Sequence, residues 1–411
     1  MALAVFIGCL AQPVWAATDP QVSRLYVDAL MRYETKDMAR AIVQLKNALA
    51  VDNKNLSVQA LLGKALLANK EVIAAEVALD EALRLGVNRA EIVVPLAQAL
   101  LGQGKPQPVL DPQRFDTNGL PPAVKSALLL LKANAASQTG DARLAMKLIE
   151  EARAIDSANA DSWLAEVPIR LRAAQFREAT ASADRALKLA PESAQAHYIR
   201  GTVAQMQSDR QGTLAMYDRA IKLSPTHTEA LVARAGMLVD LGRNADAARD
   251  LAELCNTSAG DTRGAYLRAL LAEHDKKPAE AKAALAEVTA LLDPVPLPFI
   301  RYRPQLLILG GLAHCGLNQR EKAKPYLEAA LRSQPNTPVP KLLAQIYLGD
   351  KNFDRAIEAL DSYLRGHPND VQATQLLASA HMAQGRHTRA TSLLQAAVKN
   401  RTCRPCAACW A

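Results

Sequence analysis

The sequence repeats itself with a period of 34 residues, and this period constrains the fold more than any other feature. Pro191 and Pro225 lie 34 residues apart, as do Ala186 and Ala220, each five residues before its proline. Small residues extend the same period in both directions, and we expect them to pack the repeats together. They lie at Ala41, Ala48, Gly63, Ala75, Ala82, Ala145, Ala179, Ala186, Gly201, Ala220, Ala247, Ala281, Ala323, Ala356 and Ala390. A period of this length predicts a stack of similar structural units.

Composition indicates that each unit is helical. Half of the residues are hydrophobic, mostly alanine and leucine, whereas 4% are aromatic and 22% are charged, a balance typical of all-helical chains. We expect two antiparallel helices per unit, with small residues where helix axes approach closely and proline where the second helix ends. One unit cannot bury its apolar face alone, but stacked neighbours can. About eleven units begin near residues 22, 56, 90, 126, 160, 194, 228, 262, 304, 337 and 371.

Several units share a signature of large, small and proline positions. The matches run through Trp163, Ala179, Ala186 and Pro191, through Gly201, Tyr217, Ala220 and Pro225, and through Tyr347, Ala356 and Pro368. This pattern resembles the tetratricopeptide repeat family over residues 22 to about 402. The resemblance implies an all-α fold, a right-handed superhelical solenoid of antiparallel helix pairs with about eleven repeats.

Two proline-rich interruptions divide the repeats into blocks. Residues 104–124 contain five prolines and an Asn-Gly, and residues 291–304 stretch one repeat interval to 42. We therefore expect an N-terminal block (22–118), a central block (119–292), a proline-rich linker (293–303) and a C-terminal block (304–402). A leader (1–21) precedes them, and an atypical cysteine-rich tail (403–411) follows. Each interruption is a plain linker, a hinge between rigid blocks or a loop that contacts a partner.

The leader favours export. Residues 2–17 carry no charge, and the stretch is too short to span a membrane as a mature helix. Val14–Ala16 fits a signal-peptidase site, whereas Phe6–Cys9 resembles a lipobox that would make Cys9 a lipidated N-terminus. No lysine or arginine precedes the apolar run, so we expect the natural start to lie upstream of Met1. We expect a periplasmic or outer-membrane-associated protein; a buried helix is the remaining alternative.

Motifs for catalysis are missing from the sequence. Gly102–Pro106 lacks the upstream glycine and the Ser/Thr of a phosphate-binding loop, and the seven histidines are scattered. The net charge of +8 is modest for 411 residues, and no block of like charges suggests nucleic-acid binding. We therefore expect no enzyme, no cofactor, no metal and no nucleic-acid partner.

The resemblance implies a binding groove along the first helices. In tetratricopeptide repeats the second, fifth, ninth, twelfth and thirteenth positions of a unit face this groove. Here they include Tyr26, Tyr33, Lys64, Asn134, Arg172, Tyr198, Gln205, Asp240, Tyr266, Gln345 and Gln375. Tyrosines and amides suit extended peptides or sugars. The residues argue against a groove that captures chaperone tails, because Lys341 is the only basic residue found at a fifth position.

The first third carries a closer resemblance. Residues 41–67, 74–86 and 94–111 resemble the repeat lipoprotein of the PEP-CTERM/exosortase system, and the similarity is best over 25–115. It implies an exported scaffold, anchored to the membrane at most through a lipid, whose protein partners act in envelope protein sorting or exopolysaccharide export. Members of that family are longer, so we expect this chain to be truncated. The alternatives are a groove that binds acidic exopolysaccharide directly and a tethering arm for catalytic partners.

The tail contains Cys403, Cys406 and Cys409, three positions apart. This spacing resembles three ligands of an iron–sulfur cluster, but the fourth thiolate is missing, and Trp410 stands where a c-type haem site needs histidine. A disulfide would leave one thiol over, or pair it with Cys315 or Cys255. Because composition changes at about Arg401, we expect a truncated or frame-shifted end rather than a metal or disulfide site.

Overall fold

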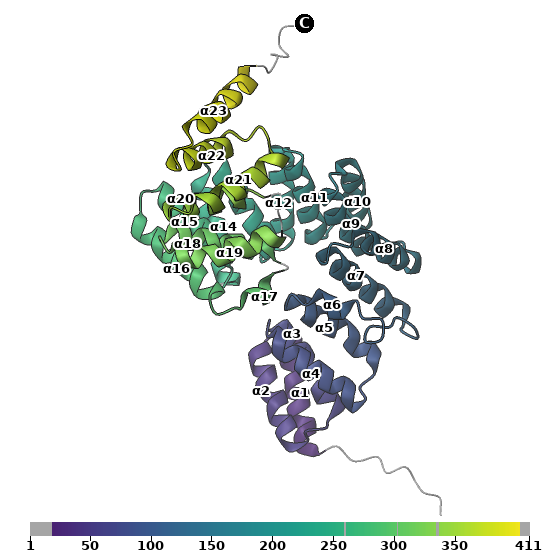
Figure 1. The fold of residues 1–411 in the computed structure, drawn as a ribbon. Coiled ribbons are helices and arrows are strands. Elements are labelled where there is room, and N and C mark those ends of the chain that lie inside the picture. The colour runs from purple at the N-terminus through teal and green to yellow at the C-terminus, as the bar shows by residue number, and fades with distance from the viewer. Residues whose placement is uncertain (1–18, 259, 302, 334–336, 403–411) are drawn as a thin grey trace, which may run out of the picture. The chain divides into compact units, whose positions relative to one another are not determined.

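The computed structural model describes residues 19–258, 260–301, 303–333 and 337–402. Helices are the only regular elements in these ranges, so the expected all-α class is confirmed. The chain divides into two compact units, one ending at Lys132 and one beginning at Ala133 (Figure 1). Cys9 and nearly all of the leader lie outside the described residues, as does the tail with its three cysteines. No helix in the described ranges has the length and apolar character needed to cross a bilayer.

The helices follow one another with short connections. In chain order they are α1 (Pro20–Glu34), α2 (Met38–Val51), α3 (Leu56–Ala68), α4 (Val72–Leu85), α5 (Arg89–Gly102), α6 (Pro106–Val109), α7 (Pro122–Gln138), α8 (Ala142–Ile155), α9 (Ala160–Arg172), α10 (Phe176–Leu189), α11 (Ala194–Met206), α12 (Arg210–Leu223), α13 (Thr228–Asp240), α14 (Asn244–Thr257), α15 (Thr262–His274), α16 (Pro278–Leu292), α17 (Leu297–Ile300), α18 (Pro304–Gly316), α19 (Arg320–Ser333), α20 (Val339–Gly349), α21 (Phe353–Gly366), α22 (Val371–Ala383) and α23 (His387–Thr402).

Consecutive helices pack as pairs, as expected. The pairs are α1 with α2, α3 with α4, α9 with α10, α11 with α12, α13 with α14, α15 with α16, α18 with α19, α20 with α21, and α22 with α23 (Figure 1). In the same order, α5 is followed by the short α6, and α7 by α8. The first helices of these eleven repeats begin within four residues of the predicted starts. The helix-pair solenoid of about eleven repeats is therefore confirmed.

Side-chain caps begin many of the helices. The Asn55 side chain accepts a hydrogen bond from the Val58 amide (3.2 Å), and the Ser193 hydroxyl accepts one from the Ala196 amide (3.2 Å). Asp370 does the same for the Ala373 amide (3.0 Å). Such caps satisfy backbone donors that have no partner inside the helix. They fix where each helix starts and so keep the repeats in phase.

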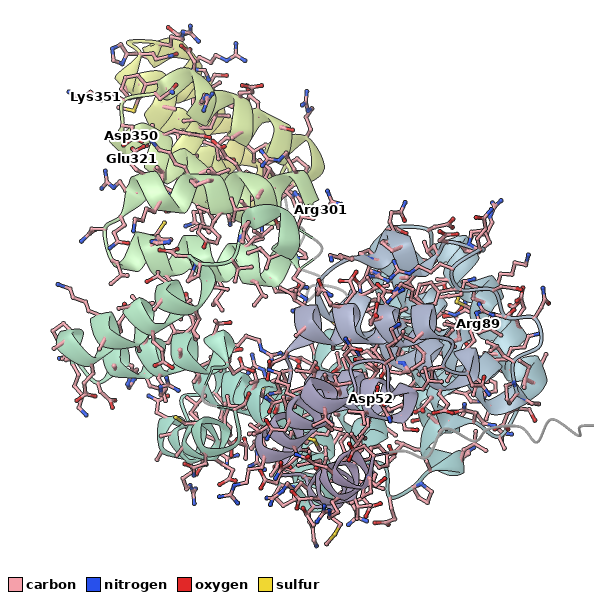
Figure 2. All side chains as sticks on the ribbon, turned by 90° about the horizontal axis from the view of Figure 1, so that it is seen from below. Asp52, Arg89, Arg301, Glu321, Asp350 and Lys351 are labelled. Atoms are coloured by element: carbon pink, nitrogen blue, oxygen red, sulfur yellow. The ribbon has the colours of Figure 1, made fainter. Side chains whose placement is uncertain are left out.

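The turn inside each repeat contains one residue in the left-handed region. These residues, with their φ angles, are Lys36 (64°), Lys70 (64°), Gly104 (71°), Gly140 (89°), Ala174 (55°), Ser208 (62°), Gly242 (71°), Lys276 (60°), Asn318 (58°), Lys351 (59°; Figure 2) and Gly385 (74°). A left-handed residue reverses the chain directly after the first helix, so that the second helix packs back onto it. Only four of these eleven are glycine, which has no steric penalty for this conformation.

The small residues of the period lie in the interior. All fifteen predicted packing positions are buried. A Cβ atom on Gly63 would lie 2.5 Å from the Leu79 side chain, and one on Gly201 would lie 2.5 Å from the Tyr217 ring. The first helix therefore approaches its partner helix so closely at these two positions that only glycine fits without a shift.

The third repeat replaces most of its second helix with an ordered loop. After the four-residue α6, the chain places Phe115 in the core with no exposed surface. Arg114 pairs with Asp80 (2.7 Å), and Arg89 (Figure 2) donates to the Asp116 carbonyl (2.6 Å). The predicted loop is therefore fixed to the first unit by an aromatic side chain and by two arginines.

Candidate functional site

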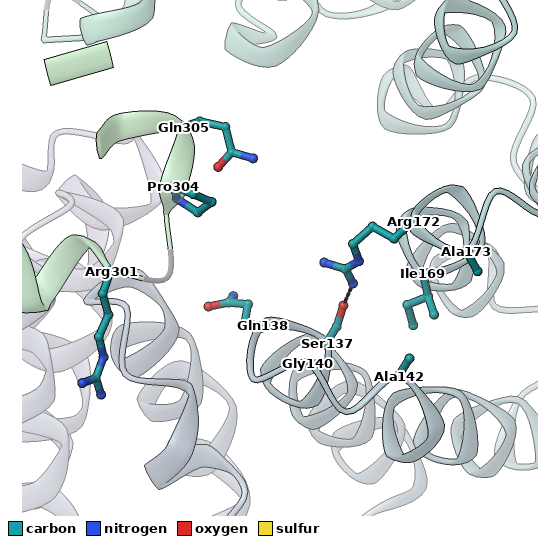
Figure 3. Close-up of a pocket in the computed structure, with 10 residues that line it drawn as sticks. All are labelled: Ser137, Gln138, Gly140, Ala142, Ile169, Arg172, Ala173, Arg301, Pro304 and Gln305. Carbon is teal, nitrogen blue, oxygen red and sulfur yellow. Dashed lines mark hydrogen bonds between the residues drawn. The ribbon is translucent and has the colours of Figure 1, made fainter. Parts of the chain in front are cut away.

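A cavity of about 700 Å³ lies within the second unit. It lies where the C-terminal ends of α7 and α9 face the segment between α17 and α18 (Figure 3). Its walls are formed by Ser137, Gln138, Gly140, Ala142, Ile169, Arg172, Ala173, Arg301, Pro304 and Gln305. The helices α7, α9 and α18 are the first helices of the fourth, fifth and ninth repeats. The cavity thus joins first helices from distant parts of the sequence.

Amide and guanidinium groups supply the polar part of the wall. Arg172, at the end of α9, hydrogen-bonds to the Ser137 hydroxyl (Figure 3). The Gln138 side-chain nitrogen donates to Asn134 Oδ1 (2.9 Å). Of the predicted groove residues, Arg172 lines the cavity, and Asn134 is bonded to the lining residue Gln138. Gln305 extends from the start of α18 on the opposite side (Figure 3).

The charge of the cavity is positive. Arg172 and Arg301 are among its lining residues, and no aspartate or glutamate is. Arg301 lies on the wall opposite Arg172, and its guanidinium is directed away from Arg172 (Figure 3). Guanidinium groups bind carboxylates and carbonyl oxygens through several parallel donors. The wall can therefore hold acidic side chains or the carbonyl groups of an extended chain, with Ile169 and Pro304 as apolar contacts.

The structure leaves every predicted groove residue at least partly accessible. Asn134, Arg172, Gln205, Asp240, Gln345 and Gln375 are exposed, and Tyr26, Tyr33, Lys64, Tyr198 and Tyr266 are half-buried. Lys64 lies 3.6 Å from Glu91, a pair formed within the first unit. Burial raises the pKa of Tyr266, so this phenol stays neutral at physiological pH. The role of these eleven residues in binding stays a prediction.

The predicted groove residue Tyr198 belongs to an aromatic cluster, and a second one, Gln205, is hydrogen-bonded to it. The Tyr198 ring lies 5.9 Å from the Tyr217 ring in a stacked arrangement and 5.5 Å from the His227 ring. The Tyr217 hydroxyl donates to Gln205 Oε1 (2.8 Å), which orients this exposed amide. Burial and the nearby Glu229 raise the pKa of Tyr198. The cluster gives the first helix of the sixth repeat a rigid surface with polar edges.

Some residues that line the cavity are not among the groove residues predicted from the repeat positions. Arg301 and Pro304 belong to the proline-rich interruption at 291–304, and Gln305 opens the next helix. One of the roles considered for that interruption was a partner-contacting loop. The proline content of this segment was the one sequence signal for such a role. The sequence does not show which repeats the segment faces.

A second hollow of about 320 Å³ differs from the cavity because its charges are paired with each other. Arg234 lies between Asp218 (2.7 Å) and Asp250 (2.6 Å). The hydrogen bond to Asp250, together with the one to Asp218, raises the pKa of Arg234. This network joins the second helices α12 and α14 to α13 and stabilises the stack rather than presenting donors to a ligand.

Other chemistry is sparse in the part of the chain that the structure describes. No group of three or more histidine, cysteine or acidic side chains comes close enough there to hold a metal ion. Cys255 and Cys315 are both free thiols, the first exposed and the second half-buried. Burial raises the pKa of the Cys315 thiol. Pairing of either with a tail cysteine stays a prediction, since residues 403–411 lie outside the described ranges.

Comparison with known families identifies the repeat type. Residues 164–227 and 341–404 match the tetratricopeptide repeat family model. These segments cover the repeats around α9–α12 and α20–α23, where the helix pairs and the 34-residue phase are regular. The match supports, over these two segments, the resemblance to tetratricopeptide repeats that was read from the sequence. The chain matches no curated protein.

The chain also matches solved structures, among which are the following three. A chain of the APC/C hetero-tetramer Cut9-Hcn1 is 12% identical, covering 87% of this chain and 96% of that chain, with a TM-score of 0.45. A tetratricopeptide repeat protein from Parabacteroides merdae ATCC 43184 is 18% identical over 62% and 98% of the two chains, with a TM-score of 0.42. The P58(IPK) TPR domain is 16% identical over 89% and 98%, with a TM-score of 0.33.

Proposed function

We propose that this tetratricopeptide repeat chain is a non-catalytic, exported scaffold that binds protein partners of an envelope sorting or exopolysaccharide-export system. Tetratricopeptide repeats are protein-interaction modules, and two segments of the chain belong to that family. The observation that supports binding most strongly is the cavity between α7, α9 and α18, whose wall offers Arg172, Gln138 and Gln305.

The cavity suits an extended acidic peptide segment. Amides of Gln138 and Gln305 can pair with peptide carbonyl and amide groups, and Arg172 can pair with a carboxylate. Its volume of about 700 Å³ holds a few residues rather than a folded domain. A linear segment of a partner, bound along the first helices, therefore fits better than a globular surface.

Export and the identity of the machinery rest on the sequence. The uncharged stretch at residues 2–17 supports a secretory leader, and Cys9 offers a lipid attachment site. The resemblance of residues 25–115 to the PEP-CTERM/exosortase lipoprotein supports the sorting role. Fractionation of cells that make the tagged full-length chain tests this part. Recovery from the envelope fraction is expected, and recovery from the cytosol alone would contradict it.

Affinity capture from envelope extracts tests the binding role. Arg172→Glu reverses a charge in the cavity and should lower recovery of sorting or secretion proteins at least about tenfold, since a charge-assisted contact becomes repulsive. Arg177→Glu is the matched control, because Arg177 is an exposed arginine on the second helix α10 and does not line the cavity. Equal recovery by both variants would exclude the cavity as the binding site.

Direct binding of acidic exopolysaccharide is the second candidate. It is favoured by Arg172 in the cavity wall and by the net charge of +8. Titration of the purified protein with the host exopolysaccharide at low and moderate salt tests it, because exposed charge pairs weaken as salt screens them. Salt-sensitive binding that Arg172→Glu removes would support it, and no binding at low salt would exclude it.

A further inference from the structure

The outward face of α1 exposes an apolar side chain at a repeat position that is buried in the other described first helices. Met31 occupies the tenth position of its repeat and is 61% exposed. The same position in later repeats is held by Ala65, Ala99, Val203, Ile346 and Ala380, all of which are buried. Val27 is 54% exposed, whereas its equivalent 34 residues later, Leu61, is 7% exposed.

The reason is the position of α1 at the start of the stack. Later first helices pack against the repeat before them, as α3 does against α2, α5 against α4 and α9 against α8. Among the described helices, α1 packs on α2 and α3, both of which follow it in the chain. The opposite face of α1 therefore carries apolar residues, as the packing faces of later first helices do, but no described helix covers it. Two exposed side chains one helical turn apart form a small patch suited to another helix.

The residues around this patch are self-complementary. Arg24, Val27, Met31 and Glu34 are exposed and fall within an arc of about 80° on the helix, given 3.6 residues per turn. Arg24 and Glu34 lie equally far on either side of the level of Ala29, and so do Val27 and Met31. In two antiparallel copies of α1, Arg24 of one copy lies opposite Glu34 of the other, and Val27 lies opposite Met31.

The charges at both ends of this face, Arg24 and Glu34, form no ion pair among the described residues. Arg24 donates to the Pro20 carbonyl of its own helix (3.2 Å). The neighbouring residues Asp28 and Arg32 form an ion pair with each other (2.9 Å) beside this face. A parallel arrangement would place like charges opposite each other, so the charge pattern selects the antiparallel one.

We propose that a second copy of this chain covers the outward face of α1, by antiparallel pairing of the two α1 helices about a two-fold axis at the level of Ala29. The contact is the same on both copies, so the assembly closes as a dimer. One helix pair buries less area than a standard interface, so we expect a dissociation constant on the order of 10 µM.

Sedimentation equilibrium of the full chain in a reducing buffer measures this directly. We expect a reversible monomer–dimer equilibrium over about 1–100 µM. Met31→Glu should raise the dissociation constant at least about tenfold, because it places a charge in the apolar centre of the contact. Ile73→Glu is the control, because Ile73 is a comparably exposed apolar residue on α4, outside the proposed contact. It should leave the equilibrium unchanged.

Charge exchange provides the sharper test. Arg24→Glu and Glu34→Arg each place like charges opposite one another twice per dimer, and each should raise the dissociation constant at least about tenfold. An equimolar mixture of these two variants should form a heterodimer, since both contacts then join opposite charges. The double variant Arg24→Glu/Glu34→Arg should recover the original equilibrium.

Three results would overturn the proposal. The full chain could stay monomeric at 100 µM. If deletion of residues 1–18 then produced dimers, that segment of the same chain would be what covers the face. The chain could form oligomers that keep growing with concentration, which indicates head-to-tail stacking. Dimers could also form equally well with Met31→Glu, or fail to form in the mixture of charge variants.

Discussion

At the scale of single residues, the left-handed turn residue is the most regular feature of the repeats and a source of strain. Among the eleven described turn residues, Ala174 alone is neither glycine nor polar, and its φ is 55°. A non-glycine residue in this conformation costs about 1–2 kcal/mol. The strain is tolerated because the turn must reverse the chain between α9 and α10.

Ala174→Gly should therefore stabilise the protein by about 0.5–1 kcal/mol, since the relieved strain exceeds the entropy that glycine loses on folding. Ala173→Gly is the control one residue earlier, where φ is −82°, and it should destabilise by a similar amount. Urea unfolding of both variants checks the pair. Two shifts in the same direction would contradict the strain argument.

Gly201 tests the close approach of the paired helices. Gly201→Ala should destabilise by about 1–3 kcal/mol, because its new Cβ would lie 2.5 Å from the Tyr217 ring. Gly236→Ala is the control within α13, where nothing lies within 4 Å of the added atom. It should stabilise by about 0.5–1 kcal/mol, because alanine favours the helix. Thermal unfolding that shows equal effects would rule out the contact.

Tyr217 predicts a pH dependence. Burial raises the pKa of Tyr217 to about 12, against 10.0 in the unfolded chain. Between pH 10 and 12 the folded state keeps the phenol proton that the unfolded state has lost, so the free energy of unfolding falls as pH rises. Unfolding of the parent chain and of Tyr217→Phe across this range measures the effect. The parent should lose more stability above pH 10, and parallel curves would contradict the burial.

At the scale of elements, the third repeat shows how a loop can replace a helix. Phe115 has no exposed surface, and it lies in the part of the sequence where other repeats have their second helix. Phe115→Ala should destabilise the protein by about 3–5 kcal/mol, because it leaves a large cavity. Ile73→Ala, at a residue that is 68% exposed, should change the stability by less than about 0.5 kcal/mol. Denaturant titration compares the two, and a small effect of Phe115→Ala would show that the loop is not part of the core.

Much of this element structure could be predicted from the period. The spacing of alanine and proline residues placed each helix pair, because close packing and helix ends depend on residue type. The left-handed turns were not predicted, since lysine, serine, alanine and asparagine share that conformation with glycine. Phe115 was not predicted either, because its burial depends on a loop that has no repeat equivalent.

The candidate site was predictable only in part. The repeat positions predicted Arg172, which lines the cavity, and Asn134, which is hydrogen-bonded to the lining residue Gln138. They did not predict Arg301 or Gln305, which reach that cavity from the ninth repeat and the segment before it. Which distant repeats face each other depends on small rotations summed over several helix pairs, and these leave no local pattern in the sequence.

At the scale of the whole molecule, the chain is a stack in which helices pack on their near neighbours in sequence. The helix pairs that make extensive contacts in the described parts are close neighbours in chain order. Such a stack offers long surfaces rather than one enclosed site. The first helices of the second unit form the cavity, and the start of the first unit presents the α1 face. The proposed partner site and the proposed self-contact therefore use different parts of the chain, one in each unit.

Site-specific photo-crosslinking in living cells tests the central claim most directly. A photoreactive amino acid at Gln305, in the cavity wall, is compared with one at Arg177, on the second helix α10. We predict a crosslink from Gln305 to an envelope protein that Arg172→Glu abolishes, and none from Arg177. A crosslinking pattern that is the same at both positions, or insensitive to Arg172→Glu, would contradict binding through the first-helix cavity.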